Sequence, residues 1–222
     1  MAHSVTRAAI VAVAISAASV ANAGTITGYL FTDANAAAAN ATLAQFTALG
    51  GASSANAKFS FSGTTNFTNA PGNNSNVTTI DQFLGSGSGS GGGGVAAIGG
   101  TTGSHILNNT YFYFTGLVGL KSGANLFTIT HDDGFELNID DVSPHPVIST
   151  PGPTAPFPTT YTVNAPSAGN YNFELAYGET AGGPAQLTVF GGTLQVPEAG
   201  SLAVLGGGMG LLGFAGSRRR RA

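Results

Sequence analysis

The segment Phe127–Asp141, FTITHDDGFELNIDD, has alternating apolar residues on both sides of an Asp-Asp-Gly triplet. The residues that share one strand face are Phe127, Ile129 and His131 before the triplet and Phe135, Leu137 and Ile139 after it. Strict alternation over two such runs predicts two half-buried β-strands. The pair Asp133-Gly134 between them predicts a hairpin turn in which Gly134 adopts a positive φ.

The same segment contains the densest group of acidic residues in the chain, namely Asp132, Asp133, Glu136, Asp140 and Asp141. Adjacent carboxylates on a tight turn concentrate negative charge, and Ca²⁺ prefers about 6–8 oxygen ligands, so Asp132 and Asp133 are the candidate metal ligands. The alternative is that both aspartates form the turn and accept hydrogen bonds from backbone N–H groups. We expect Asp140 and Asp141 at the entry to the next turn, and His131 as a half-buried strand residue.

Residues 1–23 have the features of a secretory signal peptide. Arg7 precedes an apolar run, and Ala21-Asn22-Ala23 forms a cleavage site of the A-x-A type. We therefore expect signal peptidase to remove this segment, so that the exported mature protein begins at Gly24.

Residues 196–222 consist of three consecutive parts. These are the motif Val196, Pro197, Glu198, Ala199 and Gly200, an apolar and Gly-rich run over 201–217, and the basic cluster Arg218, Arg219, Arg220 and Arg221. An apolar run followed by arginines is a stop-transfer arrangement that leaves the arginines in the cytoplasm. At about 17 residues against the usual ~20, the run predicts a slightly short transmembrane anchor helix.

This tail resembles the PEP-CTERM sorting tail of Gram-negative bacteria that produce exopolysaccharide. The resemblance implies that exosortase processes the chain, that 201–217 lies transiently in the inner membrane, and that the protein reaches the cell surface or extracellular matrix. The family motif is usually Pro-Glu-Pro, and here Ala199 takes the third position, which leaves the cleaved bond open.

Composition excludes several functions. The chain has no Cys, which excludes a disulfide framework, a thiolate zinc site and a cysteine nucleophile. Residues 24–196 contain two lysines and nine acids, a net charge of −7. A surface with so few basic side chains cannot neutralise a row of phosphates, so no nucleic-acid partner is expected.

The mature region, 24–195, is predicted to be one all-β domain, a sandwich or squashed barrel with one short helix. The predicted strands besides the two of the opening segment are 25–32, 58–67, 110–118, 171–177 and 186–190. A helix is predicted after Asn40, with Leu43, Phe46 and Leu49 on one side and Gly50 at its end. Flexible or extended loops are predicted at the Gly-rich stretch 85–94, the Pro-rich stretch 143–158 and the solvent-facing stretch 178–184.

The Asp-Asp-Gly triplet, the later stretch Ala168–Tyr177 and the strand 186–190 together resemble the protective-antigen-type domain. That β-rich domain occurs in bacterial surface proteins, glycosidases and fungal adhesins. The resemblance implies that Asp132 and Asp133 could hold Ca²⁺, which would in turn hold sugar hydroxyls.

No motif for catalysis is present: neither G-x-S-x-G nor H-E-x-x-H occurs. We therefore expect a non-catalytic surface or matrix protein associated with exopolysaccharide or biofilm. The alternative is a Ca²⁺-dependent carbohydrate-binding adhesin module that uses Asp132 and Asp133. A third hypothesis is a glycosidase that acts on exopolysaccharide through the same acidic group.

Overall fold

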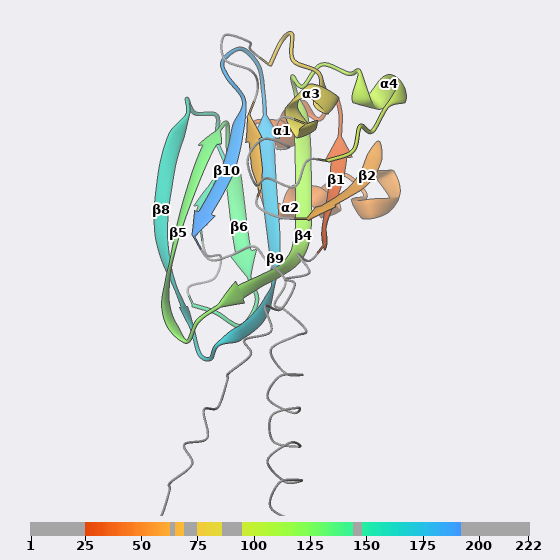
Figure 1. Ribbon diagram of the computed structural model, residues 1–222. Coiled ribbons are helices and arrows are strands. Elements are labelled where there is room, and N and C mark those ends of the chain that lie inside the picture. Colours follow the sequence, from red (N-terminus) through yellow and green to blue (C-terminus); the bar gives the residue numbers. More distant parts are fainter. Residues whose placement is uncertain (1–24, 63–64, 69–74, 86–94, 144–147, 192–222) are drawn as a thin grey trace, which may run out of the picture. The chain divides into compact units, whose positions relative to one another are not determined.

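Two antiparallel β-sheets pack against each other in the computed structural model, which describes residues 25–62, 65–68, 75–85, 95–143 and 148–191 (Figure 1). The six-stranded sheet has the order β2 (Ala57–Ser62), β1 (Thr25–Phe31), β4 (Thr110–Leu120), β9 (Gly169–Glu179), β6 (Phe135–Ile139) and β7 (Ile148–Thr150). The four-stranded sheet has the order β3 (Asn66–Thr68), β10 (Gln186–Gly191), β5 (Gly123–Asp132) and β8 (Phe157–Ala165). This arrangement confirms the predicted β-sandwich.

The core between the sheets follows from the alternation in the strands. Side chains at every second position point inward, and phenylalanines dominate: Phe67, Phe83, Phe112, Phe114, Phe127, Phe135 and Phe173 are fully buried. Many of their rings contact one another, for example Phe67 and Phe114 with centroids 5.9 Å apart. Each such side chain contributes about 1.5–3 kcal/mol by leaving water, so this core supplies most of the driving force for folding.

Short helices cover part of the outer face of the six-stranded sheet. They are α1 (Asn35–Ala38) and α2 (Leu43–Ala48), and the other short helices are η1 (Gly51–Ser54), α3 (Ile80–Gly85) and α4 (Gly100–Gly103). The predicted helix is confirmed as α2, whose Phe46 stacks on Tyr113 of β4 at 3.8 Å. Gly50 ends this segment with a φ of 92°, which only glycine adopts readily.

The Asp-Asp-Gly triplet connects the two sheets, so the prediction of a hairpin is wrong. β5 ends at Asp132 and pairs with β10 and β8, whereas β6 begins at Phe135 and pairs with β9 and β7. Both runs do bury their apolar face in the same core, but from opposite sheets. Alternation alone cannot distinguish two paired strands from two strands that face each other.

Gly134 is required for a different reason than the predicted positive φ. It is not among the described residues with positive φ, and a Cβ at this position would overlap the carbonyl group of Pro151. That carbonyl accepts a hydrogen bond from the backbone N–H of Ala41 (2.9 Å), so it cannot move away freely. Glycine therefore permits a close approach of two backbone segments.

Three further predictions need correction. The predicted strand 58–67 divides into β2 and β3, which belong to different sheets. The Pro-rich stretch 143–158 contains β7 and the start of β8, and β8 was not predicted. The stretch 178–184 does not lie wholly in solvent, because Glu179 belongs to β9 and is 2 % exposed.

The predicted signal peptide, the sorting tail and most of the Gly-rich stretch lie outside the described residues. Within the part of the chain that the structure describes, no helix is both long and apolar enough to cross a bilayer.

The contact at Gly134 can be tested with a pair of glycine substitutions. Gly134→Ala should lower the free energy of unfolding by about 1–3 kcal/mol, since the new methyl group meets a fixed backbone carbonyl. Gly152→Ala is the matched control, because a Cβ at Gly152 has no neighbour within 4 Å. Equal urea-unfolding midpoints for the two variants would contradict this role of Gly134.

Candidate functional site

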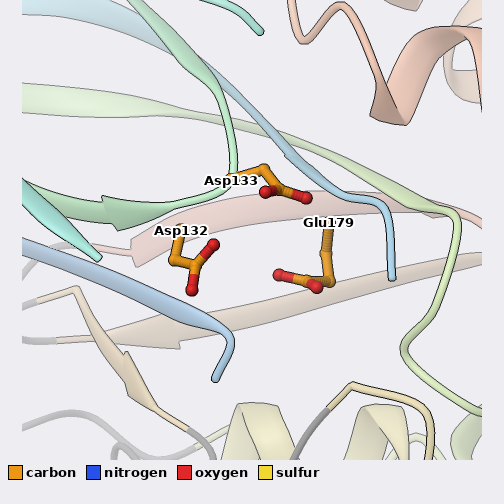
Figure 2. Close-up of side chains that lie close together, drawn as sticks. All are labelled: Asp132, Asp133 and Glu179. Atoms are coloured by element: carbon orange, nitrogen blue, oxygen red, sulfur yellow. The ribbon is translucent and has the colours of Figure 1, made fainter. Parts of the chain in front are cut away.

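Three acidic side chains converge where β5 and β9 end. Asp132 is the last residue of β5, Asp133 lies in the connection between the sheets, and Glu179 is the last residue of β9. One carboxylate oxygen from each lies within 4.8 Å of the others (Figure 2). The peptide bond between Asp132 and Asp133 is cis. The group therefore draws on both sheets, and we call it the carboxylate cluster.

Asp133 has a structural role within the cluster. Its Oδ1 accepts a hydrogen bond from the backbone N–H of Thr154 (3.1 Å), and its Oδ2 accepts one from the backbone N–H of Thr180 (2.8 Å). The hydroxyl of Thr180 also donates to Oδ2. The carboxylate thus holds the β7–β8 connection and the β9–β10 connection in place. For Asp133, this agrees with the alternative prediction that the aspartates accept hydrogen bonds from backbone N–H groups.

Asp132 differs, because its Oδ2 is buried and has no hydrogen-bond partner among the described residues. The side chain is only 5 % exposed. A buried carboxylate oxygen without a donor costs about 1–3 kcal/mol or more, so it calls for an explanation such as a bound ion or water. This oxygen is therefore the strongest indication of a missing ligand.

Gly183 lies close to this oxygen. A Cβ placed on Gly183 would lie 3.6 Å from Asp132 Oδ2 and would meet no other described atom within 4 Å. The connection between β9 and β10 thus approaches the cluster with a residue that has no side chain. Glycine at position 183 therefore keeps a side chain away from this oxygen.

Glu179 completes the cluster from the opposite sheet. Its Oε2 lies 3.2 Å from the hydroxyl of Tyr177, which also donates to the backbone carbonyl of Asp132. The pKa of Glu179 is raised to about 8, first by burial and next by the charge of Asp133, with a smaller contribution from Asp132, whereas hydrogen bonds with Ser75 and Tyr177 act in the opposite direction. Burial likewise raises the pKa of Asp132 to about 7, with the charge of Asp133 as the next cause.

No basic side chain of the described residues compensates the cluster. The ammonium of Lys58 lies 5.6 Å from the ring centroid of Tyr29, and the ion pair found in this part of the chain joins His105 to Asp33. Three carboxylates that repel one another in a buried place favour a divalent cation. Because all three ligands are hard oxygens, Ca²⁺ and then Mg²⁺ fit the donor set better than zinc or copper do.

The structure brings Asp132 and Asp133 together as predicted and adds Glu179, which the sequence reasoning missed. A signal for Glu179 did exist: Tyr171, Phe173, Leu175 and Tyr177 alternate inward along β9, and position 179 continues that register. The other acids of the opening segment lie elsewhere. Glu136 accepts a hydrogen bond from the N–H of Leu43 (3.4 Å), and Asp140 accepts one from Asn172 (3.2 Å) in the predicted turn.

His131 is more buried than predicted, with 2 % of its surface exposed. Its Nδ1 lies 2.6 Å from the carbonyl oxygen of Asp133, and its Nε2 lies 2.9 Å from the hydroxyl of Thr159. Burial lowers the pKa of His131, so the ring is neutral near pH 7. The ring supports the connection that carries Asp133.

Comparisons with known proteins identify the fold. No family model matches the chain, and no curated protein matches it. The PA14 (protective-antigen-type) sugar-binding domain of an RTX adhesin is 18 % identical, with a TM-score of 0.50 over 78 % of this chain and 98 % of that one. The PA14 domain of the MpAFP antifreeze protein is also 18 % identical, with a TM-score of 0.48 over 75 % of this chain and 79 % of that one. The mature region therefore has a PA14-like fold, as the resemblance implied.

The raised pKa values predict that the ion-free protein loses stability as the pH rises. The folded chain holds the protons of Asp132 and Glu179 up to about pH 7 and about pH 8, whereas their ordinary pKa values are 3.8 and 4.5. Their contribution to stability is therefore complete below about pH 4 and is lost as the pH passes through the folded values.

Urea unfolding in EDTA at about pH 5, 7 and 9 measures this loss, and Asp132→Asn isolates the share of Asp132 because asparagine does not titrate. Relative to this variant, the wild type should become less stable as the pH rises. If the difference in free energy of unfolding between wild type and Asp132→Asn stays constant from about pH 5 to 9, the pKa of Asp132 is not raised in the folded protein.

Proposed function

We propose that this chain is an exported, non-catalytic surface protein whose domain binds Ca²⁺ through Asp132, Asp133 and Glu179 and binds carbohydrate through that ion. The single observation that carries the proposal is the buried oxygen of Asp132 without a partner, beside two further carboxylates. A structural turn would satisfy both aspartates, as it does Asp133, and would have no need of a third acid from another sheet.

An ion at this place would compensate two costs at once. It would coordinate the oxygen of Asp132 that lacks a donor, and it would screen the repulsion among the three carboxylates. The cluster offers fewer free oxygens than the ~6–8 that Ca²⁺ prefers, because both oxygens of Asp133 already accept hydrogen bonds. Ligand hydroxyls or water would therefore have to complete the coordination.

Carbohydrate is the ligand class that fits these features best. Sugar hydroxyls are neutral hard-oxygen ligands, so they can approach a strongly acidic domain without repulsion. The comparison adds support, because the RTX adhesin domain with the similar fold is described as sugar-binding. The alternative that the domain has only a structural role in the matrix remains the competing hypothesis.

Hydrolysis of the glycan is less well supported than binding. The three carboxylates are 5 %, 7 % and 2 % exposed, and a glycosidase needs its two carboxyl groups on either side of an accessible glycosidic bond. We therefore keep the protein in the class of binding proteins.

Calcium should stabilise the protein measurably. With about 1 mM Ca²⁺ and a dissociation constant near 10 μM, binding to the folded state alone adds about 2.7 kcal/mol to the free energy of unfolding. Asp132→Asn and Glu179→Gln should remove this gain and with it any Ca²⁺-dependent sugar binding. Melting curves in EDTA and in Ca²⁺ provide the measurement, and Asp140→Asn is the control that removes an acid outside the cluster.

The two aspartates should behave differently when no ion is present. Asp132→Asn should leave the stability unchanged or raise it near pH 7. Asp133→Asn should lower it by about 1–3 kcal/mol, because asparagine keeps one acceptor oxygen where Asp133 has two, so the donors of either Thr154 or Thr180 face an NH2 group. A wild type that ignores Ca²⁺, together with a destabilised Asp132→Asn, would favour the structural hypothesis instead.

The location of the protein rests on its terminal segments, and we propose that both are removed. The mature protein should lack residues 1–23 and the region beyond roughly Pro197, since exosortase is proposed to act at the motif that contains Ala199. The intact mass of protein collected outside the cells decides this. A mass that still includes Arg218–Arg221 would show a plain membrane anchor.

A further inference from the structure

A hollow lies beside the carboxylate cluster, between the free edges of the two sheets. β7 is the last strand of the six-stranded sheet, β8 is the last strand of the four-stranded sheet, and the connection 151–156 joins them. The hollow has a volume of about 260 Å³ and is lined by His131, Thr150, Pro151, Gly152, Pro153, Thr154, Phe157 and Thr159. None of these residues belongs to the carboxylate cluster.

The walls of the hollow are mainly apolar and include an exposed aromatic ring. Phe157 is 60 % exposed, although it pairs with the buried His131 in the register of β8 and β5 and therefore faces the same side of the sheet. Pro151 and Pro153 supply further apolar surface. An exposed phenylalanine beside two prolines in a concave site is the kind of surface on which the C–H face of a sugar ring packs.

The polar groups of the hollow are neutral. They are the hydroxyls of Thr150, Thr154 and Thr159 and the backbone of the connection, and among the described residues no Asp, Glu, Lys or Arg lines it. Both nitrogens of His131 are already engaged, with the carbonyl of Asp133 and the hydroxyl of Thr159. The hollow therefore has no side chain with which to hold an ionic group.

The size of the hollow limits its occupant to a small molecule or a single ring. Its volume of about 260 Å³ lies below the ~300–1,000 Å³ of sites for drug-sized ligands. The walls are also held in place, because the N–H of Thr154 is bound to Asp133 and the carbonyl of Pro151 is bound to the N–H of Ala41. Such a preformed site loses little conformational entropy when it binds a ligand.

We propose that this hollow is a binding subsite for one neutral pyranose ring of a glycan, and that it acts without the ion. The inference rests on the proposed carbohydrate function for the class of ligand, but it does not depend on Ca²⁺. Asp132 does not line the hollow and Phe157 is not part of the carboxylate cluster, so the two sites can be removed separately.

The test measures binding of the methyl pyranosides of glucose, galactose and mannose to the full chain by saturation-transfer NMR, in Ca²⁺ and in EDTA. At least one of them should bind in EDTA, and Phe157→Ala should weaken that binding at least tenfold. Leu126→Ala is the matched control, since Leu126 is an equally exposed apolar residue (59 %) on β5 outside the hollow. Asp140→Asn, which removes an acid outside the carboxylate cluster and outside the hollow, should leave the binding in EDTA unchanged.

The outcomes separate this proposal from that of the ion site. Absence of binding in EDTA, or equal binding by wild type and Phe157→Ala, would overturn the subsite even if Ca²⁺-dependent binding is found. Stronger binding of glucuronate than of the neutral glycosides in EDTA would also overturn it. Binding in EDTA that depends on Phe157, in a protein that Ca²⁺ does not stabilise, would support the subsite and count against the ion site.

Discussion

The carboxylate of Asp133 is the interaction on which the functional end of this domain depends. It lies where the chain crosses from one sheet to the other, and it accepts hydrogen bonds from two connections that are distant in the sequence, at Thr154 and Thr180. Each of those segments borders a different feature: Thr154 lines the hollow, and the segment after Thr180 passes over Asp132. A single buried acid thus sets the position of both candidate binding sites relative to the core.

The cost of this arrangement is visible in its electrostatics. The described part of the chain contains only two lysines and no arginine, so the carboxylates at the crossing rely on hydroxyls and backbone N–H groups instead of ion pairs. Those donors satisfy Asp133 but leave one buried oxygen of Asp132 without a hydrogen-bond partner among the described residues. The domain keeps a locally unfavourable charge density in a core that is otherwise well packed with aromatic rings, which is the pattern expected where function competes with stability.

Local patterns predicted most of the strands and the pair Asp132 and Asp133, because alternation and turn residues act over a few positions. The β-sandwich also followed from them. The pairing of the strands did not follow from these local patterns. The apolar side chains of β5 and β6 alternate in the same way whether the two strands form a hairpin or belong to opposite sheets. The sequence does not reveal Glu179 for a related reason: the glycines of 178–184 predict a solvent-exposed loop, although the alternation of β9 continues into it. The close approach of Gly134 to Pro151 depends on residues far apart in the sequence and has no local signal.

The connection between β7 and β8 contains both residues that are fixed to the rest of the domain and residues that are exposed at the hollow. The carbonyl of Pro151 is bound by the N–H of Ala41 and the N–H of Thr154 by Asp133, whereas Gly152, Pro153 and Phe157 are exposed around the hollow. Substitutions at these three exposed positions would change the shape of the site without disturbing the buried framework. If the proposed subsite is correct, a few surface positions could change which sugar ring fits, much as antibodies vary their loops on a constant scaffold.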